Sequence, residues 1–243
     1  MRNFKVSVII PLAPNDIISI KFEQQLSSLP NDWEILFCSP KANDREILKN
    51  HNTRYIMTQS GRANCLNEGA KHATGEYLWF LHSDSLLSKG TVSKLTKITE
   101  NNVSALYYFD LAFYKSRCHL IKLNEWGAFF RCRCLKTPFG DQGFFMKKDL
   151  FNEFGDYSTD VAYGEDHLLV RNLRKNNILI KPIGIKLYTS ARKYELNGWL
   201  KTTINHLYLW RKQASFYEKA YRKEMKNENC SSNILQNSRH FSS

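Results

Sequence analysis

Apolar and polar residues follow two alternating periods through the first hundred positions of the chain. A β-branched run over Phe4–Pro11 predicts a buried strand closed by a proline, and the apolar spacing over 16–29 predicts a helix. The same alternation predicts strands at 34–38, 54–57 and 76–81 and helices at 43–50, 62–73 and 91–100. We therefore expect an α/β fold, with a mostly parallel sheet, helices on both faces and ligands at the carboxyl ends of the strands.

The pattern changes after residue 100. Strands are predicted at 104–114, 143–146 and 178–188, and helices at 148–154, 165–175 and 196–223, with a helix or broken helix at 124–137. We expect one domain over 1–226, comprising a nucleotide-binding half (1–100), an acceptor and catalytic half (101–195) and a basic aromatic helix (196–226). The polar residues 227–243 are expected to form a disordered tail.

Length and composition narrow the class of protein. The 243 residues, 42% of them hydrophobic, suffice for one large α/β domain, although two small ones are also compatible with the length. No apolar run approaches the roughly 18 residues that span a bilayer, and the start does not read as a cleavable signal. We expect a cytoplasmic protein, with the inner face of the membrane as a second location. The six cysteines form no CxxC pair, which fits a reducing compartment.

The net charge of +12 indicates a negatively charged partner, for which nucleic acid, anionic lipid and a phosphorylated substrate all qualify. Lysines and arginines concentrate after Ser190, where aromatic residues separate them. A basic, aromatic, amphipathic helix at the C-terminus is typical of contact with a membrane surface, and an ordinary solvated helix packed on the sheet is the alternative. No nucleic-acid recognition motif accompanies the charge, so we expect no nucleic-acid partner.

Three short segments could carry chemistry. The strand exit His82-Ser83-Asp84 offers a carboxylate that could ligate a divalent cation, although aspartates also follow strands as turn formers. Glu165 and Asp166 open a predicted helix, where they could be caps or a catalytic base with its neighbour. The turn Gly140-Asp141-Gln142 could bind sugar hydroxyls or be an ordinary turn. Arg62 and Asn67 on an earlier helix could reach a base or diphosphate, or lie solvated on the surface.

The order of these pieces resembles a known family. The matching segments are Val8-Ile9-Ile10-Pro11, Gly61-Arg62-Ala63-Asn64, Phe80-Leu81-His82-Ser83-Asp84-Ser85, Pro138-Phe139-Gly140-Asp141-Gln142 and Glu165-Asp166. Together they look like family 2 glycosyltransferases of the GT-A (Rossmann-like) fold, and most like a small bacterial branch with a Leu-His-x-Asp exit and a Gly-Asp-Gln block. The resemblance covers about residues 4–210.

The resemblance implies a role for each segment. Pro11 would begin the nucleotide pocket, Arg62 would approach the nucleotide, and His82 would replace the usual first acid. Asp84 would hold Mn²⁺ or Mg²⁺ against the diphosphate. Asp166 would be the catalytic base, with Glu165 beside it. Further residues are expected in the site. For the nucleotide sugar these are Asn67, Ser83, Arg192 and Lys193, and for the sugar and acceptor they are Gly140, Asp141 and Gln142.

The activity that follows is an inverting transfer from a UDP- or GDP-sugar to a hydroxyl acceptor, in glycolipid or cell-surface polysaccharide synthesis, with a lipid-linked acceptor as one candidate. Where the family usually has an acid after the second strand, this chain has Cys38-Ser39-Pro40-Lys41, and Asn15-Asp16 stands in an altered first loop. A non-catalytic binding protein of the same fold is therefore one alternative. A nucleotidyltransferase is the other, but the expected Gly-rich loop after the first strand is missing.

Overall fold

The computed structural model describes residues 5–14, 16, 18–41, 52–114, 116, 118–161, 163–205, 208–209 and 211. The chain divides into two compact units, Met1–Leu196 and Asn197–Ser243. The first contains the sheet, and in the second the residues 199–205 are helical after Gly198. Among the described residues, no helix combines the length and the apolarity needed to cross a membrane.

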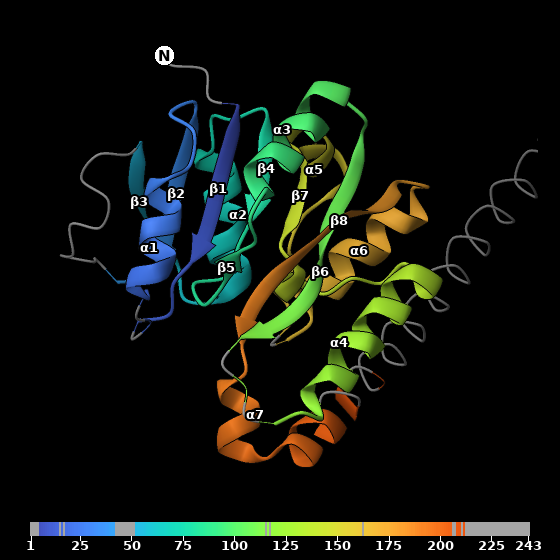
Figure 1. The fold of residues 1–243 in the computed structure, drawn as a ribbon. Helices are drawn as coiled ribbons and strands as arrows, with labels where there is room; N and C mark the ends of the chain where they lie inside the picture. The colour runs from blue at the N-terminus through green and yellow to red at the C-terminus, as the bar shows by residue number, and fades with distance from the viewer. Residues whose placement is uncertain are drawn as a thin grey trace, which may run out of the picture. The chain divides into compact units, whose positions relative to one another are not determined.

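An eight-stranded sheet in the order β3-β2-β1-β4-β7-β6-β8-β5 organises the described part of the first unit (Figure 1). The strands are β1 (Val6–Pro11), β2 (Trp33–Ser39), β3 (Thr53–Met57), β4 (Tyr77–Phe80), β5 (Leu86–Leu87), β6 (Ala105–Tyr114), β7 (Phe144–Lys147) and β8 (Leu179–Ser190). Six strands run parallel, and only β5 and β7 are antiparallel to their neighbours. The expected α/β fold with a mostly parallel sheet is confirmed.

Helices cover both faces of this sheet. They are α1 (Ile20–Ser27), α2 (Arg62–His72), α3 (Thr91–Asn101), α4 (Ile121–Phe130), α5 (Lys148–Phe154), α6 (Glu165–Lys175) and α7 (Arg192–Asn197). Residues of α2, α5 and α6 share one apolar core with the sheet, and those of α1 and α3 share the other. Because both faces are covered, the middle strands β1, β2 and β4 are almost completely buried, which explains their continuous apolar runs.

The strand order places a switch point at β1. The chain passes from β1 to β2 on one side, and after β3 it returns to the other side of β1 as β4. Ligands of open α/β sheets bind at such a point, beyond the carboxyl ends of the strands. Strand β7 is antiparallel to β4 with Phe144 opposite Phe80, so the turn before β7 lies beside the exit of β4. The topology thus brings residues 140–142 to His82.

Several boundaries differ from the expectation. Helix α1 begins at Ile20 rather than near residue 16, because the Ser19 hydroxyl caps it by accepting a hydrogen bond from the Phe22 amide. The expected helix at 124–137 is broken: α4 ends at Phe130, and a π-helical turn, Arg131–Leu135, follows. The expected helix at 43–50 lies outside the described residues, as does the tail at 227–243.

Candidate active site

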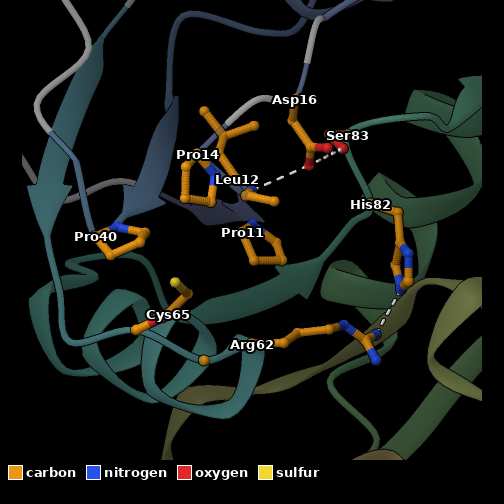
Figure 2. Close-up of a pocket in the computed structure, with 12 residues that line it drawn as sticks. Pro11, Leu12, Pro14, Asp16, Pro40, Arg62, Cys65, His82 and Ser83 are labelled. Atoms are coloured by element: carbon orange, nitrogen blue, oxygen red, sulfur yellow. Dashed lines mark hydrogen bonds between the residues drawn. The ribbon is translucent and has the colours of Figure 1, made fainter.

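A cavity of about 290 Å³ lies at the switch point of the sheet, at the lower end of the range for ligand pockets. Its walls come from the exits of β1, β2 and β4 and from the start of α2, as Figure 2 shows. The lining residues are Pro11–Pro14, Asp16, Pro40, Ser60–Arg62, Cys65, His82 and Ser83. Of the residues expected to bind the nucleotide, Pro11, Arg62, His82 and Ser83 therefore meet at one cavity.

Asp16 ties two walls of this cavity together. Its Oδ2 accepts hydrogen bonds from the Ala13 amide at 3.1 Å and from the Ser83 hydroxyl at 3.0 Å. The loop after β1 is thereby linked to the loop after β4, as the dashed line between Asp16 and Ser83 in Figure 2 indicates. In the sequence Asp16 stands in an altered first loop, and in the structure this residue lines the cavity.

Arg62 occupies the first position of α2 and faces the interior of the site. Its Nη1 donates to Glu165 Oε1 at 2.6 Å, and its Nη2 lies 2.5 Å from His82 Nε2. Burial alone would lower the pKa of Arg62, but the carboxylates of Asp166 and Glu165 outweigh this effect and raise it. One guanidinium thus connects α2, the exit of β4 and the start of α6.

The contact with Arg62 determines the tautomer and the protonation state of His82. A guanidinium can only donate hydrogen bonds, so the His82 Nε2 must be the unprotonated acceptor and the ring proton must sit on Nδ1. Burial, and then the positive charge of Arg62, lower the pKa of His82 to about 3. His82 is therefore neutral at physiological pH, and it cannot replace the negative charge of the acid that usually stands at this position.

Asp166 lies at the start of α6 and is buried. Its Oδ2 accepts a hydrogen bond of 2.5 Å from the Gly140 amide, and its Oδ1 accepts one of 3.0 Å from the His167 amide. Burial would raise the pKa of Asp166, but His167, Arg62 and the Gly140 amide together lower it. The carboxylate is therefore ionised at neutral pH and is held at a fixed place against the turn 140–142.

Gly140 allows this close arrangement because it has no side chain. A Cβ at this position would lie 2.5 Å from Arg62 Nη2 and 3.0 Å from Asp166 Oδ2. Arg62 Nη2 is already held by His82 Nε2, and Asp166 Oδ2 is held by the Gly140 amide, so these atoms could not easily move away. Glycine here is required by packing, which a turn propensity alone does not reveal.

Asp141 is the least satisfied acid of the site. Its Oδ1 is buried and has no hydrogen-bond partner among the described residues. Burial raises its pKa to about 6, which Arg131 opposes and the charges of Asp166 and Asp84 reinforce. A buried carboxylate oxygen without a hydrogen-bond partner destabilises the folded protein, and such atoms are often found at ligand-binding sites.

Gln142 holds the turn in place. Its Oε1 accepts hydrogen bonds from the Phe139 amide at 3.0 Å and from Arg131 Nη2 at 3.2 Å, and its Nε2 donates to the Phe109 carbonyl at 2.9 Å. The side chain is almost fully buried, with 1% exposed. In this arrangement Gln142 binds protein groups, and its expected contact with a sugar gains no support.

Asn67 is likewise engaged elsewhere. Its Nδ2 donates to the Tyr157 carbonyl at 2.8 Å and its Oδ1 accepts from the Tyr157 amide at 3.0 Å, which joins α2 to the loop after α5. Asn67 does not appear among the described residues that line the cavity. Its expected contact with the nucleotide therefore gains no support from this geometry.

Asp84 is exposed beyond the exit of β4. Its Oδ2 accepts a hydrogen bond of 3.3 Å from the Thr189 hydroxyl at the end of β8. The described residues contain no group of three or more metal-binding side chains. A magnesium or manganese site built from one carboxylate, water and substrate phosphates does not need such a group, and the exposed Asp84 fits that kind of site.

Arg192 and Lys193 begin α7 directly after β8, and both side chains are exposed. The pKa of His82 is lowered by burial and Arg62, and the charge of Lys193 adds to this effect. Lys193 therefore acts electrostatically on the site. The expected neutralisation of a diphosphate by these two residues stays a prediction.

Arg131 was missed by sequence reasoning. Its guanidinium carbon lies 3.1 Å from the centroid of the Phe139 ring, and its Nη2 donates to Gln142. It also opposes the rise in the pKa of Asp141. Arg131 thus supports the turn 140–142 through Phe139 and Gln142. Its position at the end of a broken helix gave no signal of this role.

Comparison with known proteins gives the family and fold. Glycosyl transferase family 2 matches residues 21–156. The S. aureus protein TarS, residues 1–349, is 16% identical with a TM-score of 0.62, covering 77% of this chain and 61% of that one. The mannosyltransferase PcManGT from Pyrobaculum calidifontis, in complex with GDP-Man and Mn²⁺, is 18% identical with a TM-score of 0.56, covering 76% of this chain and 56% of that one.

The chain thus spans about three fifths of the length of these solved structures. TarS 1–349 has also been solved in complex with UDP-GlcNAc, and that structure is 17% identical with a TM-score of 0.56, covering 77% of this chain and 58% of that one. Curated protein sequences give no significant match. The fold agrees with the expected GT-A arrangement, and the family match covers more than half of the sequence. The chain belongs to glycosyl transferase family 2.

Proposed function

We propose that this protein transfers a sugar from a nucleoside diphosphate sugar to a hydroxyl acceptor, with inversion at the anomeric carbon. Family membership supports the reaction class. The observation that carries the proposal is that one partly buried network, built from Arg62, His82, Glu165 and Asp166, joins a cavity at the switch point to a buried carboxylate. A donor and a base would therefore meet at this edge of the sheet.

The cavity suits a nucleotide. Pro11, Pro14 and Pro40 give it apolar walls against which a base could lie. Helix α2 begins at the cavity with Gly61, which supplies no side-chain cap, and its first turn contains no acid. The positive end of a helix and a guanidinium together favour a diphosphate. UDP- and GDP-sugars are the proposed donors, as the solved relatives bind UDP-GlcNAc and GDP-Man.

Asp84 would hold Mn²⁺ or Mg²⁺, with the donor phosphates supplying further oxygen ligands. When bound, such an ion supplies positive charge that stabilises a departing nucleoside diphosphate. Arg192 and Lys193 are placed to add to that charge, since both are exposed at the start of α7 and Lys193 acts on His82. This assignment of Asp84, Arg192 and Lys193 rests on position and charge.

Asp166 would accept the proton of the attacking hydroxyl. Its lowered pKa keeps it ionised, and the Gly140 amide fixes its orientation. The acceptor oxygen forms a bond to the anomeric carbon while the bond to the diphosphate oxygen breaks, and its electrons leave with the diphosphate. One displacement inverts the configuration. Glu165 holds Arg62 beside the base, and Gly140 and Asp141 would face the sugar and acceptor while Gln142 holds their turn in place.

The acceptor is proposed to be a hydroxyl of a glycolipid or cell-surface polysaccharide precursor, with a lipid-linked molecule as one form. The protein would then work in the cytoplasm or at the inner face of the membrane. The support is the concentration of lysines and arginines between aromatic residues after Ser190 and the net charge of +12. The membrane contact through 196–223 stays a prediction.

The donor site can be tested by thermal unfolding with a panel of nucleoside diphosphates, with and without Mn²⁺, for the wild type and Asp84→Ala. A ligand at 100 times its Kd stabilises the native state by about 2.7 kcal/mol, which raises the melting temperature measurably. We expect a shift that needs both metal and one nucleotide and that disappears in Asp84→Ala. A folded wild type without a shift for any nucleotide would contradict the proposal.

Two other functions follow from the same fold. A non-catalytic binding protein is favoured by the segment Cys38-Ser39-Pro40-Lys41 at the end of β2, which contains no acid, and it would bind a nucleotide without turnover. A nucleotidyltransferase would need phosphate-binding residues directly after β1, where Leu12, Ala13 and Pro14 stand. Release of a nucleoside diphosphate together with a glycosylated product separates the proposed reaction from both.

A further inference from the structure

Helix α4 carries an exposed apolar face. Leu123, Trp126 and Phe130 recur at helical spacing with 58%, 65% and 53% of their surface exposed. Three neighbours enlarge this set: Leu120 and Phe129 at 50% and 43%, and Leu135 in the following π-helical turn at 50%. We call these six residues the α4 face. Single exposed apolar residues are ordinary, but six within sixteen positions of one segment indicate an interaction surface.

The opposite side of the helix is firmly attached to the sheet, so the exposure is not the result of a loosely placed helix. Ile121, Glu125 and Ala128 are buried. Glu125 Oε1 accepts a hydrogen bond of 3.0 Å from the Phe113 amide in β6, and Asn124 donates one of 3.1 Å to the Tyr194 hydroxyl. With these contacts made, the α4 face must point away from the sheet.

Basic residues flank the α4 face along the chain. Lys122, Arg131, Arg133 and Lys136 lie on or directly after α4, whereas Glu125 is the only acid between 118 and 140 and its side chain is turned inward. Arg133 is paired with Asp110 at 3.0 Å and also covers the Phe129 ring. Lys122 likewise pairs with Glu125 at 3.0 Å, so the remaining charge of +2 comes from Arg131, which lies over Phe139, and from the exposed Lys136. Aromatic rings beside lysine and arginine side chains are typical of surfaces that bind the headgroup region of an anionic bilayer.

The size of the surface distinguishes between possible occupants. Fifteen residues of helix extend for about 22 Å, and with a helix diameter of about 10 Å one face covers roughly 220 Å². This area is well below the roughly 800 Å² per partner of a stable protein interface. Shallow insertion into a bilayer needs only one such face, supported by attraction to anionic lipids. The surface therefore fits a lipid surface better than a second copy of the chain.

We propose that the α4 face docks the protein on an anionic membrane surface, with Trp126 and Phe130 inserted between the headgroups. This surface belongs to the first unit and differs from the expected contact through residues 196–223. It is continuous with the candidate site, because Arg131 at its end covers Phe139 and donates to Gln142. The inference does not depend on the proposed activity, since it concerns lipid binding alone.

The test is flotation of the full-length protein with vesicles of phosphatidylcholine, with or without about 30% phosphatidylglycerol. We expect the wild type to float with the anionic vesicles. Trp126→Ser/Phe130→Ser should bind them at least about tenfold more weakly. The matched control is Ile20→Ser/Met57→Ser, which removes two apolar side chains that are 75% and 67% exposed elsewhere. The control should float like the wild type.

A second measurement locates the contact. Brominated lipids quench tryptophan emission only at short range, and the chain has five tryptophans, of which Trp33 and Trp79 are buried. We expect most of the quenching to disappear in Trp126→Phe, a variant that keeps an aromatic ring. Unchanged quenching in that variant would assign the contact to Trp199 or Trp210 and overturn the proposal.

Two further results would also overturn it. One is equal flotation of the wild type and Trp126→Ser/Phe130→Ser, with both folded by circular dichroism. The other is a wild type that binds no vesicles and is a dimer by light scattering, while Trp126→Ser/Phe130→Ser is a monomer. That result would make the α4 face a contact between copies of the chain.

Discussion

Arg62 and Glu165 form an ion pair of 2.6 Å although 103 positions separate them in the sequence. The second terminal nitrogen of Arg62 meets the neutral His82, and Asp166 follows Glu165 directly. The pair thus fixes the first turn of α6, which carries the proposed base, against the first turn of α2, which borders the proposed nucleotide cavity.

Removing the charge of Arg62 should therefore destabilise the fold. In Arg62→Met, Glu165, which is 6% exposed in the wild type, would lose its partner, and we expect a loss of about 2–3 kcal/mol in the free energy of unfolding. Urea titration measures this loss. The double variant Arg62→Met/Glu165→Gln should recover part of it, because no unpaired charge is left. An additive effect of the two substitutions would show that the residues do not interact.

Gly140→Ala should disturb the site far more than its size suggests. The added methyl group would meet Arg62 Nη2 at 2.5 Å and Asp166 Oδ2 at 3.0 Å, so we expect a loss of about 1–3 kcal/mol in stability together with loss of turnover. The control is Gly127→Ala in α4, where a Cβ meets nothing within 4 Å and the helix should gain up to about 1 kcal/mol. Equal melting temperatures for the two variants would contradict the geometry.

Asp141 should make stability depend on pH in an unusual direction. Its pKa is raised from 3.8 to about 6, so between these values the folded state holds a proton that the unfolded state has lost. Its contribution to stability is fully present below pH 3.8 and is lost as the pH rises through 6, by about 3 kcal/mol in all.

Asp141→Asn should accordingly stabilise the metal-free protein at pH 8 and have little effect near pH 4. Urea titration at several pH values, with a chelator present, measures the difference. If Asp141→Asn is no more stable than the wild type at pH 8, the carboxylate is not held in an unfavourable environment.

Asn67 provides a test between a structural and a ligand-binding role. Asn67→Asp keeps the acceptor for the Tyr157 amide but removes the donor to the Tyr157 carbonyl. We expect a loss of about 1–3 kcal/mol in stability and an unchanged nucleotide Kd in the folded protein, both measured by calorimetry. Weaker nucleotide binding at unchanged stability would instead support the contact with the nucleotide that the sequence suggests.

Much of the fold follows from local pattern. The buried runs of β1, β2 and β4 and the amphipathic spacing of α6 identify those elements directly, and alternation predicts the parallel sheet. Strand β5 has two residues and leaves no periodic signal. The start of α1 was predicted too early because its apolar pattern extends beyond the residue that caps it, Ser19.

The site was predictable in part. The resemblance of ordered motifs brought Pro11, Arg62 and His82 together, and the structure places all three at one cavity. The resemblance could not show which polar side chains already have hydrogen-bond partners within the protein. Asn67 and Gln142 are bound to backbone groups 90 and 33 positions away. Such pairings depend on tertiary packing, and a polar residue in a motif looks the same whether it binds a ligand or the chain itself.

The most direct test of the proposed activity is release of nucleoside diphosphate from a panel of UDP- and GDP-sugars, measured with Mn²⁺ and a membrane extract as the source of acceptor. Wild type and Asp166→Asn are compared after nucleotide binding has been confirmed for both. We predict release from a donor of one nucleobase, with a glycosylated product, and a loss of about 10²–10⁴-fold in Asp166→Asn. Nucleotide binding without release from any donor, or equal release by the variant, would contradict the account.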